Sequence, residues 1–138
     1  MKTAALILLA LLFCGVLFAQ KGGPTKVEGK PKISRAGVEY WDIKVGTGAT
    51  AESGKKVTVS YAGWLTTGKE FDANKSFQFN LGAGDVIKGW DDGVQGMKVG
   101  GKRQLKIPSN LAYGSRGAGG VIPPNATLIF DIELLAVK

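Results

Sequence analysis

The side chains that most enzymes use for acid–base, nucleophilic or metal chemistry are nearly absent from this chain. It contains no histidine, and its single cysteine, Cys14, lies in an apolar N-terminal run. Serine–histidine–aspartate triads, histidine metal sites and histidine acid–base catalysis are therefore excluded. If the N-terminal run is removed, a thiol nucleophile, a disulfide and a thiolate zinc site are excluded as well. We expect no metal and no cofactor, so any catalysis has to proceed without them.

Three segments are similar to known chemical motifs, but each departs from its motif at a decisive position. Gly63–Lys69 matches the first seven positions of a phosphate-binding loop, yet Glu70 stands where Ser or Thr should hold magnesium. Gly82–Gly84 is followed by Ile87 where a dinucleotide fingerprint needs its third glycine, so we interpret it as a turn. The adjacent pair Asp91-Asp92 points in two directions on a helix, and we interpret it as a solvated face.

Large aromatic side chains remain as the candidates for a site. Six rings come from separate segments but occupy positions that can all face one interior. They can belong to the hydrophobic core, or they can line a concave apolar site with a few polar groups, and the residue pattern leaves both interpretations open. The six are Tyr61, Phe71, Phe77, Trp90, Tyr113 and Phe130.

Short strands are expected to position these rings. Alternation of apolar and polar residues predicts strands at residues 38–45, 57–65, 77–81, 102–107 and 127–137. A turn at 67–69 leads into a short separate segment, 70–72. Regular structure is expected to begin near Val38.

One helix is expected among these strands. Apolar residues recur at helical spacing through 85–97, where Asp85 is predicted to cap the N-terminus. Gly89, Gly93 and Gly96 share a second face that can lie close against a sheet. The elements together predict the α+β class, an antiparallel β-sheet wrapped around one short α-helix.

Several stretches of the sequence resemble the FKBP-type peptidyl-prolyl cis/trans isomerases, in the same order along the chain. They are Tyr61–Gly63, Gly68–Asp72, Val86–Gly93, Ala112–Gly114 and Ile122–Leu135. The resemblance covers about residues 38 to 137. It implies a curved antiparallel sheet over one helix, a pocket between them, and peptidyl-prolyl cis-trans isomerase activity.

The resemblance also implies a role for each site residue. Trp90 would form the pocket floor, with walls formed by Tyr61, Phe71, Phe77 and Phe130. The rim would be formed by Val86, Ile87 and Ile122, and the polar groups would be Asp72 and Tyr113, with the Ile87 backbone N–H as a donor to the substrate. The sequence departs from the family in two places, a short bulge at Ala73–Ser76 and a small residue, Ala118, in the flap.

The implied reaction suits this inventory of side chains. An X-Pro bond isomerises through a twisted amide that has lost resonance and much of its polarity. An apolar aromatic pocket favours that state without moving a proton or forming a covalent bond. The expected partners are unfolded or proline-containing polypeptides, together with macrolides such as tacrolimus or rapamycin. Two rival functions are a holdase that grips unfolded chains without useful catalysis and an exported structural domain with a decayed pocket.

The N-terminus has the features of a targeting segment. Lys2 precedes an apolar run of about 15 residues, Ala4 to Phe18, which is short for a membrane span. We predict a signal peptide at residues 1–19, a flexible leader at 20–35, and an isomerase domain at 36–138, in a periplasmic or secreted protein. The alternatives are an uncleaved membrane anchor and a lipoprotein modified at Cys14.

The net charge of +7 does not by itself indicate a nucleic-acid partner. The lysines are spread along the chain without a dense run, so the charge is interpreted as general solubility and no nucleic acid is expected. No helical arm or exposed apolar stripe is left over in the predicted domain. The domain is therefore expected to be a monomer.

Overall fold

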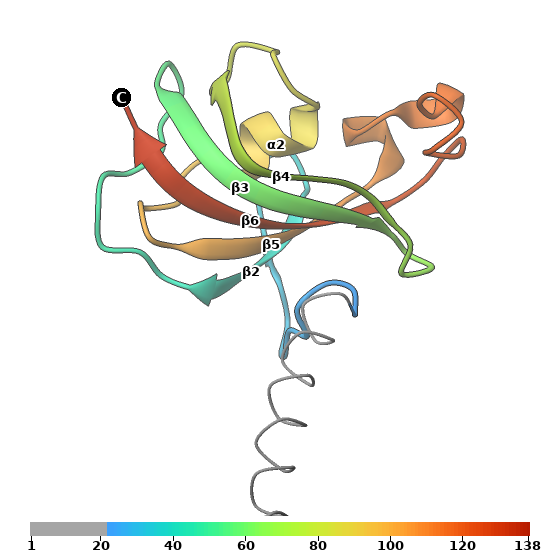
Figure 1. The fold of residues 1–138 in the computed structure, drawn as a ribbon, viewed down its shortest axis with the longest axis horizontal. Helices are drawn as coiled ribbons and strands as arrows, with labels where there is room; N and C mark the ends of the chain where they lie inside the picture. Colours follow the sequence, from blue (N-terminus) through green and yellow to red (C-terminus); the bar gives the residue numbers. More distant parts are fainter. Residues whose placement is uncertain (1–21) are drawn as a thin grey trace, which may run out of the picture.

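A curved six-stranded antiparallel sheet wraps around one short helix in the computed structural model of the chain (Figure 1). The structure describes residues 22–138, and the predicted signal peptide at 1–19 lies outside them. The strand order is β1-β2-β5-β6-β3-β4. The elements are β1 Lys32–Ile33, β2 Glu39–Lys44, β3 Lys56–Leu65, β4 Glu70–Asn80, α2 Lys88–Gly93, β5 Lys102–Ile107, the 3-10 helices η1 Ser109–Leu111 and η2 Gly114–Arg116, and β6 Leu128–Val137. The predicted fold class is confirmed.

The concave face of the sheet forms the hydrophobic core. Side chains two residues apart lie on one face of a strand, which is why the predicted rows of apolar residues in β3 and β6 point the same way. Val57 and Val59 of β3 and the row 128, 130, 132 and 134 of β6 are all buried. The two strands pair along nearly their whole length, from Val57 opposite Val137 to Leu65 opposite Leu128.

One prediction about the strands was wrong. The segments 70–72 and 77–81 were expected to be separate, but β4 runs through both of them without a break. Its register against β3 shifts between the pairs Tyr61–Asn74 and Val59–Phe77, so the extra residues form a bulge inside the strand. A bulge adds a residue without ending the ladder, and it re-aims the side chains beside it.

The helix is shorter than the sequence predicted. It covers Lys88–Gly93 rather than 85–97, and Ile87 precedes it without a side-chain cap. The Asp85 carboxylate instead accepts a hydrogen bond from the Asn80 N–H at 3.0 Å, so it stabilises the preceding turn. Gly96 lies beyond the helix with φ of +87°, a conformation that favours glycine.

Close contact between the helix and β5 is confirmed for two of the three glycines. A side chain at Gly93 would place its Cβ 2.9 Å from Leu105, and one at Gly89 would collide with Ile107. Buried Arg103 of β5 also holds the C-terminal end of the helix, donating to the carbonyls of Gly93 and Gln95 at 2.9 and 3.0 Å. A cation is favoured at this end of a helix.

The interpretation of Asp91 and Asp92 as a solvated face was incomplete. Their side chains do point apart, but each accepts hydrogen bonds from backbone. Asp91 accepts from the N–H groups of Gly82 and Gly84 at 2.8 and 2.9 Å, and Asp92 accepts from Ala36 at 3.0 Å. Both carboxylates therefore fasten neighbouring loops to the helix.

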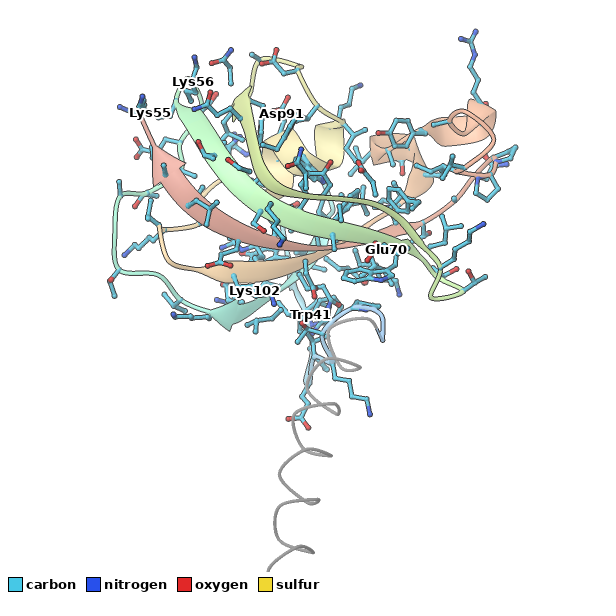
Figure 2. All side chains as sticks on the ribbon, in the orientation of Figure 1. Trp41, Lys55, Lys56, Glu70, Asp91 and Lys102 are labelled. Carbon is cyan, nitrogen blue, oxygen red and sulfur yellow. The ribbon has the colours of Figure 1, made fainter. Side chains whose placement is uncertain are left out.

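The segment before β1 makes specific contacts from Thr25 onward. It lies on the convex side of the sheet, opposite the helix (Figure 1). Thr25 donates two hydrogen bonds to the buried carboxylate of Asp131, at 2.9 Å from its N–H and 2.8 Å from its hydroxyl. Gln104 donates to the Thr25 carbonyl at 2.7 Å and to Asp131 at 2.9 Å. Figure 2 shows Trp41 on this same side, next to the segment.

Regular structure also begins earlier than Val38, where the sequence predicted it. Strand β1 pairs with β2, with Lys32 opposite Tyr40 and Ile33 opposite Glu39. The start of the catalytic domain at residue 36 stays a prediction. Within residues 22–138, no helix is long and apolar enough to cross a membrane.

Candidate active site

A cavity of about 280 Å³ opens beside the helix on the concave side of the sheet. Three long strands, the helix and two loops each contribute to its walls. The lining residues are Tyr61 from β3, Phe71, Asp72 and Phe77 from β4, Asp85, Val86 and Ile87 from the loop before the helix, Trp90 from α2, Tyr113 between η1 and η2, and Phe130 from β6.

Trp90 is the centre of the aromatic packing around this cavity. Its ring is buried, and it contacts Tyr61 and Phe130 edge to face with centroids 4.8 and 5.2 Å apart. Phe77 approaches it at 6.1 Å, and Phe79 supports it from behind at 5.6 Å. Edge-to-face contacts of this kind stabilise each ring pair by about 0.5–1.5 kcal/mol beyond burial, so the walls are rigid.

Gly63 of β3 gives two further rings room in the cavity wall. A Cβ at this position would lie 2.6 Å from Phe130 and 2.8 Å from Phe71. These two rings meet edge to face with centroids 5.5 Å apart. Any larger residue at 63 would push them apart, so the glycine is required by close approach.

The polar groups of the cavity converge on one carboxylate. The Tyr61 hydroxyl donates to Asp72 Oδ2 at 2.6 Å. Burial raises the pKa of Tyr61 well above its ordinary value of 10, and the hydrogen bond to Asp72 and its negative charge raise it further. Burial, and then the charge of Asp72, also raise the pKa of Tyr113. Both phenols therefore stay neutral at physiological pH and can act only as hydrogen-bonding groups.

Two N–H groups of residues that line the cavity lack acceptors among residues 22–138. The Ile87 carbonyl accepts from Trp90 and Asp91 at the start of the helix, but its own N–H donates to no group there. This leaves the Ile87 N–H free to bind a ligand carbonyl at the rim. The indole N–H of Trp90 is buried without a partner in the same part of the chain, at a typical cost of about 1–3 kcal/mol.

Nine of the ten residues assigned from the sequence line this one cavity, and they come from six separate parts of the chain. The tenth, Ile122, is 6% exposed and packs in the hydrophobic core, and it does not line the cavity. The sequence assignment missed Asp85, which lines the rim, because the residue was interpreted as a helix cap. It also missed Phe79, whose alternation with Phe77 in β4 was visible but gave no sign of contact with Trp90.

No metal-binding group accompanies these residues. Within residues 22–138 no cluster of three or more histidine, cysteine, aspartate or glutamate side chains is arranged to hold an ion. The cavity offers aromatic surface, one carboxylate–phenol pair, a second phenol, a second carboxylate at the rim and a free backbone donor. This combination suits an apolar segment that carries a carbonyl group.

Comparisons with known proteins agree on one family. The sequence model of the FKBP-type peptidyl-prolyl cis-trans isomerases matches residues 48–135. The FK506-binding protein of Neisseria meningitidis serogroup A is 56% identical over 100 residues, which cover 70% of this chain and 92% of that protein. FK506-binding protein 4 of Dictyostelium discoideum is 56% identical over 103 residues, but the match covers only 28% of that longer protein.

Solved structures give the same result. The peptidyl-prolyl cis-trans isomerase of Pseudomonas syringae superposes with a TM-score of 0.74 at 38% identity, covering 82% of this chain and 84% of that one. FkpA of Escherichia coli superposes with a TM-score of 0.73 at 43% identity, but this chain spans only 53% of it. The chain belongs to the FKBP family and is a peptidyl-prolyl cis-trans isomerase.

Proposed function

We propose that this isomerase works by non-covalent stabilisation of the twisted X-Pro amide inside the aromatic cavity, and that its substrates are proline-containing segments of exported proteins. The observation that carries the proposal is the content of the cavity. Five aromatic rings form its walls and floor, while its phenols have raised pKa values and no imidazole or thiol lines it. Such a site suits a reaction that transfers no proton.

The physical argument starts from the peptide bond. Rotation about it costs about 18–20 kcal/mol because the planar form has resonance, and the twisted form is less polar. Apolar walls solvate the twisted amide better than the planar one, and they exclude the water that stabilises the planar form. Lowering the barrier by about 6 kcal/mol would accelerate the step roughly ten-thousandfold.

The polar groups would orient the substrate in this scheme. The Ile87 N–H, which has no acceptor among residues 22–138, would donate to a substrate carbonyl and so fix the peptide over Trp90. The Asp72 carboxylate, held by the Tyr61 hydroxyl at 2.6 Å, would face the twisting amide, and Tyr113 would donate from the other side. Binding of tacrolimus or rapamycin in the same cavity belongs to the proposal.

A protease-coupled assay on a short proline peptide, with and without tacrolimus, tests the reaction and the site together. We expect turnover that tacrolimus inhibits competitively. Turnover that tacrolimus leaves unchanged at saturating concentration would contradict macrolide binding in this cavity, and the absence of turnover would contradict the activity.

We further propose export through the signal peptide at residues 1–19, release into the periplasm or medium, and a monomeric mature protein. Support comes from the apolar run of residues 4–18 and its small residue at Ala19. Intact-mass analysis of the exported protein should give a chain that starts near Gln20. A chain that keeps Cys14 and carries added lipid mass would overturn the soluble form in favour of a lipoprotein.

Sedimentation showing a stable dimer at micromolar concentration would overturn the monomer.

A further inference from the structure

A second hollow, larger and more open than the aromatic cavity, lies on another part of the molecule. Its volume is about 720 Å³, and it is bounded by residues 26–32 before and within β1 and by residues 40–45 of and after β2. None of the residues that line the aromatic cavity contributes to it. It is therefore a separate surface, and the isomerase reaction does not account for it.

The hollow exists because pairing between β1 and β2 stops early. Lys32 lies opposite Tyr40, so the same register would place Pro31 opposite Trp41. Proline has no N–H to donate to a ladder, and strands commonly end beside it. Among residues 22–138 no strand pairs with this edge of β2 beyond Tyr40. The edge from Trp41 to Lys44 is therefore open.

Two exposed apolar side chains line the hollow at this edge. Val45 is 71% exposed and Ile43 36%. In the part of the chain that the structure describes, these are two of the six large hydrophobic side chains that are exposed. An open strand edge with exposed apolar residues is a template for pairing with another chain, and a soluble protein rarely leaves one without a partner.

Charge around the hollow favours an acidic partner. Lys26, Lys30 and Lys32 line it, against Glu28 and Asp42. Asp42 is already neutralised, because it accepts a 2.7 Å hydrogen bond from Arg103 and lies 3.9 Å from Lys32. The lysine stems are long enough to follow apolar surface while their ammonium groups reach a bound chain.

The wall opposite the strand edge is held in place. Thr25 is bound to Asp131 and Gln104 on the convex face, as described above. Further along, the indole N–H of Trp41 donates to the Gly29 carbonyl at 3.0 Å. The hollow is therefore preorganised, which lowers the entropic cost of binding.

We propose that the open β2 edge binds an extended, acidic and apolar segment of the client polypeptide, which adds as a strand beside Trp41–Val45. The proposal rests on the isomerase function and deepens that function, because the edge would be a second binding site for the same substrate. Main-chain hydrogen bonds would supply affinity that depends little on the sequence of the bound segment. A client held at this edge would present its prolines to the aromatic cavity at a raised effective concentration.

The test uses fluorescence anisotropy with a labelled, proline-free peptide of about nine residues, long enough to overhang the open edge at both ends. Valine alternates with glutamate in this peptide, and with lysine in a matched control peptide. We expect the glutamate peptide to bind and the lysine peptide to bind about tenfold more weakly. An excess of a short proline substrate should not displace it.

Val45→Asp is the diagnostic variant, because the side chain is exposed and lies outside the catalytic cavity. We expect it to weaken binding of the glutamate peptide about tenfold, while Leu135→Asp, at an exposed apolar position of β6, leaves binding unchanged. Turnover of the short proline peptide should be equal in both variants and the unmodified enzyme. Absence of that turnover would contradict the isomerase function and leave the binding result to stand alone.

Five outcomes would overturn the proposal. The glutamate peptide fails to bind, or it binds Val45→Asp as tightly as the unmodified protein. It is displaced by the proline substrate, which would place it in the aromatic cavity. Sedimentation reveals a dimer that Val45→Asp dissociates, which would make the edge a contact between two copies. Vesicles of anionic lipid bind the protein while the peptide does not.

Discussion

The two faces of the sheet are built from the same strands but differ in what they bind. On β6, Phe130 forms a wall of the aromatic cavity, whereas its neighbour Asp131 points to the convex side and holds Thr25. On β5, Leu105 packs against the helix, whereas Gln104 binds the Thr25 carbonyl. Neighbouring residues of a strand point to opposite faces. One short stretch of sequence can therefore supply an apolar catalytic wall and a polar docking surface at once.

The two faces are held in place by different kinds of interaction. The concave face is held by edge-to-face packing of aromatic rings around Trp90. The convex face is held by a small network of hydrogen bonds around one buried carboxylate, Asp131, which is 8% exposed. The first should decide catalysis, and the second should decide only how firmly the segment before β1 is attached. Mutations can test that division.

The largest effect is expected from the cavity floor. Trp90→Ala should lower kcat/KM roughly a hundredfold, equivalent to about 2.7 kcal/mol of barrier. It should also lower the free energy of unfolding by about 3–5 kcal/mol, because four other rings lose their central contact. Turnover is measured by the protease-coupled assay and folding by circular dichroism. The exposed residue Lys106 on β5 gives the control variant Lys106→Ala, with both quantities unchanged.

Because Trp90→Ala can fail to fold, Phe130→Leu gives a milder test of the same wall. It keeps an apolar side chain at the position but removes the ring that contacts Phe71, Tyr61 and Trp90. Folded Phe130→Leu protein with full turnover would show that this ring belongs to the core alone. Asp91→Ala is not a suitable control, since its carboxylate fastens the loop at Gly82 and Gly84.

On the convex face the expected effect is on stability. Asp131→Ala removes the acceptor of three hydrogen bonds and leaves Gln104 partly unsatisfied, which should cost about 2–3 kcal/mol of unfolding free energy. Denaturant titration measures this loss. The kcat/KM of the folded variant on a short peptide should remain that of the parent enzyme. A large fall in kcat/KM without a fall in stability would show that the two faces are coupled.

A smaller effect is expected from the polar pair of the cavity. Tyr61→Phe keeps the ring beside Trp90 but removes the hydroxyl that donates to Asp72 at 2.6 Å. Losing one such hydrogen bond should cost about 1 kcal/mol, so kcat/KM should fall roughly fivefold while stability changes little. Full activity in this variant would mean that the orientation of Asp72 does not matter for the reaction.

The fold was predictable in strands that bury the side chains of one face and expose those of the other. The rows of apolar residues in 57–61 and 128–134 specified strand faces because a slip of one residue would expose the whole row. The start of the helix was not predictable, because the Asp85 carboxylate accepts from the Asn80 N–H rather than capping the helix. The ordered segment before β1 was missed for a related reason. Thr25 is held by residues 79 and 106 positions away, and no local pattern records such contacts.

The site was predictable in part. Composition and spacing alone could not separate a core of six rings from a pocket, and the resemblance to the family assigned the roles. Neither the residue pattern nor the resemblance predicted contacts between distant parts of the chain. Examples are Asp85 on the rim and Phe79 behind Trp90. The hollow beside β2 was also not predictable, since it depends on the pairing of β1 with β2 ending at Lys32 opposite Tyr40.

The central claim is that no proton moves during catalysis, and the pH dependence of kcat/KM on an uncharged proline peptide tests it most directly. The pKa values of Tyr61 and Tyr113 are raised above their ordinary value, so both phenols stay protonated throughout the neutral range. With no histidine in the chain, kcat/KM should be constant between about pH 5.5 and 8.5, without a solvent isotope effect. A bell-shaped profile centred near neutrality, and abolished by Asp72→Asn, would contradict the account and make that carboxylate an acid–base group.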